Sequence, residues 1–154
     1  MQFLIFHLGK DRYGLHTRDV VRVLPLMELK QMPQTPAYVA GLMNFRGSPV
    51  PVIDLCMLAS GSACPPLFDT RIILVDYVAA EERHLLGLIA ERVSGVEHID
   101  PATFVEPGVS SPDAPFLGNV AARGQAMLQL INIEYLLPDE VRALLFRSRA
   151  ETMP

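Results

Sequence analysis

An internal repeat constrains the fold of this chain more than any other feature of its sequence. Residues recur at matched positions in two copies: Gly14, Leu15, Val20, Val23, Gly41, Arg46 and Gly47 correspond to Gly87, Leu88, Val93, Val96, Gly118, Arg123 and Gly124. With one residue inserted in the second copy, the run at 53–55 corresponds to the run at 131–133. This register predicts two copies of one unit, over roughly residues 3–58 and 71–137.

Both copies have the pattern of short β-strands. Apolar residues alternate with polar residues or prolines, and turn-forming residues follow about every 8–12 positions. Such spacing is typical of a barrel or a sandwich, with about five strands in each copy. We expect a linker at 60–70, a mobile loop at 106–115, and one C-terminal helix over 138–149 followed by a tail at 150–154.

The composition argues against several classes of protein. Half of the 154 residues are hydrophobic and 19% are charged, which is not the composition of a disordered chain. A net charge of −4 with scattered basic residues does not predict a nucleic-acid partner. No apolar run approaches the roughly 18 residues of a membrane-spanning helix, and the N-terminus lacks the features of a signal peptide. We therefore expect a cytoplasmic protein that does not insert into a membrane.

No arrangement of residues predicts an active site, a metal centre or a cofactor site. Motifs that bind phosphate or activate a nucleophile are absent from the sequence. The four histidines lack metal-ligand spacing and are interpreted as structural: His7, His16, His84 and His98. Asp54 is interpreted as the cap of a short helical turn, because its counterpart Asn132 cannot ionise but can accept the same hydrogen bond. The chain is therefore not expected to be an enzyme.

The two cysteines are expected to remain free thiols. Cys56 lies in an apolar run and should point inward, whereas Cys64 lies in the expected linker. No CxxC motif and no neighbouring histidine suggest metal binding or nucleophilic catalysis. We therefore predict that Cys56 and Cys64 do not form a disulfide, as in a reduced cytoplasmic protein.

Arg46 is a candidate binding residue with two interpretations. As a solvated turn residue it would match Arg123, which occupies the same place in the second copy. As a guanidinium displayed at the rim of a barrel, it could bind a partner's carboxylate through two hydrogen bonds. Val20, Val23 and Leu24, next to an edge strand bounded by a proline, are typical of a surface that another barrel could extend or cover.

The segments around this turn are highly specific when taken together. The run PAYVAGLMNFRG at 36–47 is followed by VPVIDL at 50–55 and preceded by YGL at 13–15 and VVRVL at 20–24. These segments resemble the CheW family of chemotaxis coupling proteins, and the resemblance extends over about residues 2–145. It implies an all-β fold of two five-stranded SH3-like barrels packed over a shared apolar seam. We expect a single domain over 1–147, with the first barrel at approximately 10–60 and the second at approximately 70–137.

The resemblance also implies a non-enzymatic scaffold without a cofactor. Members of this family join the cytoplasmic tips of methyl-accepting chemoreceptors to the regulatory domain of the histidine kinase CheA, in membrane-associated receptor arrays. The positions that match the family's kinase contacts are Val20, Arg22, Val23, Asn44 and Arg46. The positions that match its receptor contacts are Arg46, Thr70, Arg71, Ile72, Ile73, Gly87 and Leu88.

The sequence departs from the family at Arg22, where many members are acidic. This departure suggests a dedicated kinase partner, in a signalling pathway that need not be flagellar. Two alternatives remain: an interaction module with this fold but no kinase partner, and a barrel that binds a small molecule.

Overall fold

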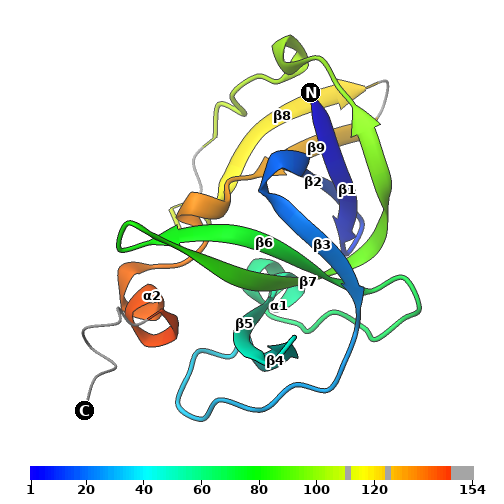
Figure 1. Cartoon of the computed structure of the whole chain (residues 1–154). Helices are drawn as coiled ribbons and strands as arrows, with labels where there is room; N and C mark the ends of the chain where they lie inside the picture. The colour runs from blue at the N-terminus through cyan, green and yellow to red at the C-terminus, as the bar shows by residue number, and fades with distance from the viewer. Residues whose placement is uncertain (110–111, 124–125, 147–154) are drawn as a thin grey trace.

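The computed structural model describes residues 1–109, 112–123 and 126–146, and shows two β-barrels side by side (Figure 1). The strands are β1 (Gln2–Leu8), β2 (Asp11–His16), β3 (Val20–Pro25), β4 (Val39–Phe45), β5 (Ser48–Asp54), β6 (Arg71–Ala79), β7 (Glu82–His98), β8 (Leu117–Arg123) and β9 (Ala126–Ile131). The helices are α1 (Leu55–Ser60), α2 (Asp139–Leu145) and the 3₁₀ turns η1 (Thr17–Asp19), η2 (Pro101–Thr103) and η3 (Ile133–Tyr135). The predicted all-β fold with a short C-terminal helix is confirmed. No helix among these described residues is long and apolar enough to span a membrane.

The two repeats exchange strands. One barrel contains β1, β2, the second half of β7, β8 and β9; the other contains β3, β4, β5, β6 and the first half of β7. The exchange is reciprocal and has the same register in both barrels. Leu4 pairs with Val96 in one barrel, as Ile73 pairs with Val23 in the other. Likewise, Gly14 pairs with Leu130 in the first barrel, as Gly87 pairs with Val52 in the second. Each repeat therefore supplies its first hairpin to one barrel and its later strands to the other.

The predicted barrel boundaries, 10–60 and 70–137, are therefore wrong. The 17-residue strand β7 continues from one barrel into the other. Figure 1 shows β7 passing from the lower barrel to the upper one. Arg92 (φ 48°) and Gly95 (φ 152°) interrupt its extended backbone where the strand changes barrels. A repeat in the sequence cannot reveal whether equivalent strands pair within one copy or between the two.

The repeated glycines lie where the exchanged strands meet. Gly14 is in β2 next to β9, and Gly87 is in β7 next to β5, in the two parallel pairings of the fold. A Cβ on Gly87 would lie 3.0 Å from methyl carbons of Val52 and Ile72, closer than ordinary van der Waals contact. The close approach of neighbouring strands thus requires glycine at position 87, whereas a Cβ on Gly14 would meet its neighbours at ordinary distances of 3.5–3.7 Å.

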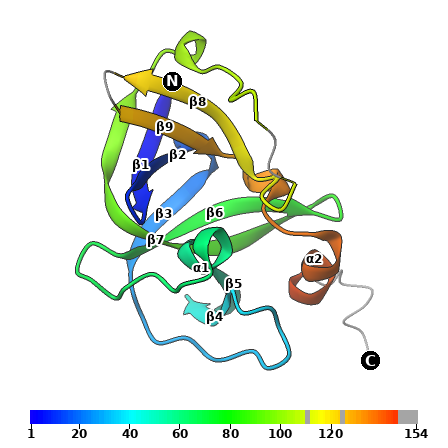
Figure 2. The same cartoon turned by 180° about the vertical axis from the view of Figure 1, so that it is seen from behind.

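The two barrels share an apolar core. One cluster of buried side chains draws on strands of both barrels, and its members include Leu4, Phe6, Leu15, Ile53, Ile73, Leu88 and Ile131. Figure 2 shows α1 lying against β7 and β5 on the rear face, and its Leu55 and Cys56 belong to the same cluster. Because the cluster crosses the boundary between the barrels, burial of apolar surface stabilises their packing as well as each barrel.

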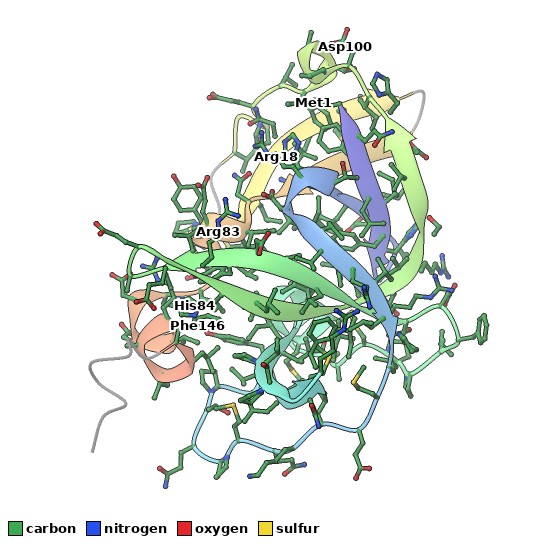
Figure 3. The ribbon with its side chains drawn as sticks, in the orientation of Figure 1. Met1, Arg18, Arg83, His84, Asp100 and Phe146 are labelled. Atoms are coloured by element: carbon green, nitrogen blue, oxygen red, sulfur yellow. A yellow bond between two sulfur atoms is a disulfide. The ribbon has the colours of Figure 1, made fainter. Side chains whose placement is uncertain are left out.

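The C-terminal helix α2 is held by an aromatic side chain that follows it. The helix ends at Leu145, and the predicted extension over 147–149 lies outside the described residues. Phe146 is buried between Tyr77 and His84, with ring centroids 5.4 and 4.6 Å away (Figure 3). The stacked rings anchor α2 to the β6–β7 hairpin.

Replacing Phe146 with alanine is expected to lower the free energy of unfolding by about 3 kcal/mol, since it removes a buried aromatic ring and leaves a cavity. Leu144→Ala, two residues earlier on the exposed side of α2, should change it by about 0.5 kcal/mol. Urea unfolding of both variants measures the difference. Equal losses would show that the stacked rings do not anchor the helix.

Candidate functional site

The residues matched to kinase contacts gather on one face of the molecule, around β3. This strand pairs with β6 only, among the strands that the structure describes, so its other edge is open. Arg22 is exposed on it, and the flanking Val21 and Val23 have 46% and 36% of their surface exposed. Val20 is half-buried against the core. An open edge with apolar and cationic side chains is typical of a surface that another chain covers.

The second part of this face is the tight turn between β4 and β5. Phe45 and Ser48 close the hairpin, and both turn residues have left-handed backbone, Arg46 at φ 52° and Gly47 at φ 87°. Asn44, which is exposed, accepts a hydrogen bond from the Gly47 N–H through Oδ1 (2.8 Å). A left-handed conformation costs a non-glycine residue on the order of 1 kcal/mol, so arginine at this position is not favoured by the backbone.

Arg22 and Arg46 converge on one aromatic ring. Their guanidinium carbons lie 6.0 and 5.2 Å from the centroid of the half-buried Phe45 ring, within the range of cation–π interactions. Within the described part of the chain, neither guanidinium has a carboxylate at ion-pair distance. The Arg22–Phe45–Arg46 cluster therefore displays two unneutralised cations on a protein of net negative charge. Sequence reasoning missed Phe45, although it adjoins Arg46 in the same motif.

The residues matched to receptor contacts are mostly in the core, and direct contact by their side chains is not supported. Five of the seven are buried: Thr70, Ile72, Ile73, Gly87 and Leu88. Thr70 directly precedes β6, and the other four lie in β6 and β7, which are interior strands of the sheet where an apolar side chain packs between layers. Arg71 is half-buried and its Nη1 donates to the carbonyl oxygen of Val93 (3.4 Å). Of this set only Arg71 and Arg46 reach the surface.

Asp54 caps α1, as its sequence position predicts. Its Oδ1 accepts a hydrogen bond from the Met57 N–H (3.1 Å). The buried carboxylate also accepts the Cys64 N–H, at 3.3 Å to Oδ1 and 3.2 Å to Oδ2. The counterpart Asn132 precedes η3 but makes no side-chain cap hydrogen bond, so the equivalence of the two positions is only partial.

Cys56 and Cys64 form a disulfide, which corrects the prediction of two free thiols. Cys56 is buried as expected, but Cys64 is half-buried rather than exposed in a free linker. The physical reason is the Asp54 carboxylate, which binds the Cys64 N–H and brings this part of the loop back to α1. The eight-residue separation of the two cysteines gave no indication of this return.

Asp54→Ala is expected to lower the free energy of unfolding by about 1–2 kcal/mol, because it leaves the Met57 and Cys64 N–H groups without their acceptor. Asp54→Asn should cost about 0.5 kcal/mol, since an amide oxygen can still accept at the cap. Thermal melts of the two variants at neutral pH test this. If asparagine is as damaging as alanine, the charge itself stabilises the fold and capping alone is insufficient.

The histidines have structural surroundings. Burial and the nearby Arg92 and Arg12 lower the pKa of His7, and burial with Arg18 lowers the pKa of His16. His84 stacks on Phe146 and His98 is exposed at the end of β7. Across the described residues, Asp54 is the one charged side chain that is buried. The geometry thus favours a surface that binds another protein over a charged pocket for a small molecule.

Comparisons with known proteins agree with this description. A family model described as "CheW-like domain" matches residues 2–141. The chain is 29% identical to the chemotaxis protein CheW of Klebsiella aerogenes, over 93% of this chain and 85% of that protein. It is 30% identical to protein FrzA of Myxococcus xanthus, over 88% of this chain and 84% of that protein. It is 28% identical to protein PilI of Pseudomonas aeruginosa, over 80% of this chain and 68% of that protein. The crystal structure of the scaffolding protein TtCheW from Thermoanaerobacter tengcongensis superposes with a TM-score of 0.78 at 27% identity, over 91% of this chain and 89% of that one.

Proposed function

Because the chain belongs to the CheW-like family, we propose that it is a non-enzymatic adaptor that couples chemoreceptors to a CheA-like histidine kinase. Relatives named as chemotaxis CheW, FrzA and PilI, and a solved scaffolding protein, support the adaptor role. In this proposal the adaptor works in the cytoplasm and joins membrane receptor arrays through protein contacts. Its partners are the cytoplasmic tip of a receptor and the regulatory domain of the kinase.

The observation that carries the proposal is the Arg22–Phe45–Arg46 cluster beside the open edge of β3. Arginine and aromatic side chains are the residues that dominate the energetics of protein interfaces, and an open strand edge offers unpaired backbone groups to a partner. Val21 and Val23 add exposed apolar surface next to the two guanidiniums. We assign the kinase to this face, with Val20, Arg22, Val23 and Arg46 as contacts and Asn44 shaping the turn that presents Arg46.

For the receptor, only Arg46 and Arg71 keep a proposed direct role. The buried residues of that set can affect receptor binding only through the position of β6 and β7. Arg22 in the kinase face supports a dedicated partner with carboxylates at the opposing position, because two unneutralised guanidiniums favour an acidic surface.

Isothermal titration of the folded protein with the isolated regulatory domain of a CheA-like kinase from the same organism tests the proposal. We expect binding in the micromolar range or tighter, as in transient signalling complexes. Arg22→Glu should weaken binding at least about tenfold, because it places like charges across the interface. If the folded wild-type chain does not bind this domain, the alternative of an interaction module without a kinase partner is favoured.

A further inference from the structure

Cys56 and Cys64 connect α1 to the loop that leads into β6. Cys56 lies in the first turn of α1 with 5% of its surface exposed, and Cys64 is half-buried eight residues later. Their Cα atoms are 5.1 Å apart and their sulfurs are bonded. They are the only cysteines in the chain. The pair is therefore held at bonding distance by the surrounding fold, and not by chance encounter of two mobile segments.

A second, redox-independent link joins the same two segments. The Asp54 carboxylate accepts N–H groups from both α1 (Met57) and the loop (Cys64), and its oxygen lies within 4.8 Å of both sulfurs. At its other end the loop is fixed by the buried Thr70, whose Oγ1 donates to the Pro65 carbonyl oxygen (2.7 Å). These contacts do not depend on the disulfide, so the loop stays attached to the barrel when the disulfide is reduced.

We propose that Cys56 and Cys64 are a reversible thiol–disulfide modification site whose reactant is a small-molecule disulfide such as oxidised glutathione. This inference goes beyond the adaptor function and does not depend on it. In a thiol-rich compartment the pair would be reduced at rest and become oxidised when the disulfide fraction of the thiol pool rises. The disulfide form described above is then the oxidised state of the site.

The reaction is two successive thiol–disulfide exchanges. The Cys64 thiolate, the more accessible of the two, attacks one sulfur of the small disulfide, and the first small thiol leaves. The Cys56 thiolate then attacks the Cys64 sulfur of the mixed disulfide, and the second small thiol leaves. Two electrons pass from the protein thiols to the small disulfide, and the two protons released by Cys56 and Cys64 end on the two small thiols.

The structural consequence is confined to the loop at 61–69. Between its two fixed ends this loop presents Leu67 and Phe68, and Phe68 has 96% of its surface exposed. The disulfide fixes the end near α1, whereas Thr70 and the hydrogen bond from the Val93 N–H to the Asp69 carbonyl oxygen (3.1 Å) fix the other end. Reduction therefore leaves the end near α1 held only by the hydrogen bonds from the Cys64 N–H to the Asp54 carboxylate, and the redox state sets how firmly this exposed apolar pair is presented.

To test the proposal, the reduced protein is equilibrated with glutathione buffers in which the oxidised fraction increases. Acid quenching, alkylation and mass spectrometry then count the free thiols. We expect both thiols to disappear together, with loss of two hydrogen atoms and no retained glutathione. Hydrogen exchange of the amides at 61–64 should be at least about tenfold faster in the reduced form, with the strands unchanged. In Cys64→Ser, which cannot form the disulfide, these amides should exchange at the fast rate in every glutathione buffer.

Asp54→Asn supplies a chemical control. A carboxylate next to the sulfurs disfavours a thiolate, so removal of its charge should make oxidation about three- to tenfold faster while an acceptor remains at the cap. Thiols that stay free at every glutathione ratio, a stable mixed disulfide, equal loop exchange in both states, or a reduced pair blocked by bound zinc would each overturn the proposal.

Discussion

Replacing Gly41 with alanine is expected to lower the free energy of unfolding by about 2–5 kcal/mol, because it combines backbone strain with a steric clash. Gly41 in β4 has φ 148°, and a Cβ there would lie 2.5 Å from the carbonyl oxygen of Lys30. That oxygen accepts the Leu42 N–H (2.7 Å), while the Lys30 N–H donates to the Leu42 carbonyl oxygen (2.9 Å). The clash would thus break the contact that holds the segment before Pro33 against β4. Urea unfolding monitored by circular dichroism measures the loss.

Gly47→Ala is the matched control for this substitution. Gly47 also has positive φ (87°), but a Cβ there would have nothing within 4 Å. It should therefore show only the cost of left-handed backbone, about 1 kcal/mol. A loss for Gly41→Ala no greater than that for Gly47→Ala would contradict the close approach of Lys30.

Arg46→Ala is expected to weaken binding of the kinase regulatory domain by about 1–3 kcal/mol, the range for a lost charge-assisted contact, and to leave stability within about 0.5–1 kcal/mol. Because Arg46 has left-handed backbone, the free energy of unfolding of Arg46→Gly should be about 1 kcal/mol higher than that of Arg46→Ala. The two variants should nevertheless lose binding equally, since both lack the guanidinium. Thermal melts and isothermal titration of the pair separate the role of the backbone from that of the side chain.

Arg123→Ala is the control at the matching position of the second repeat, and its side chain lies outside the described residues. It should change neither binding nor stability. Equal behaviour of the Arg46 and Arg123 variants, or unfolding of the Arg46 variant, would remove Arg46 from the proposed interface.

The duplicated fold could be predicted because the glycines and apolar residues of the repeat mark its strands. The matched glycines Gly14 and Gly87 hold in the structure as equivalent positions of two parallel pairings, Gly14 opposite Leu130 and Gly87 opposite Val52. The exchange of strands could not be predicted, since spacing along a chain does not show which copy a strand pairs with. Nothing in the sequence marks β7 as one strand crossing both barrels.

The candidate site was predicted in part. The type of residue and the turn indicated Arg46, and a carboxylate before an apolar run indicated the Asp54 cap. The receptor residues were matched by position in a motif, which does not distinguish a surface contact from the core strand beneath it; Ile72 and Leu88 proved to be fully buried. The disulfide was missed because it depends on a hydrogen bond between Asp54 and the loop, a contact visible only in three dimensions.

Sedimentation of membranes that carry the cognate chemoreceptor tests the adaptor role most directly. With receptor membranes and purified kinase, we expect the kinase to sediment only when this protein is added, and this protein to sediment with receptor in the absence of kinase. Arg22→Glu should still sediment with receptor but fail to bring down the kinase. Kinase that sediments equally without this protein, or a folded wild-type chain that binds neither component, would contradict the account.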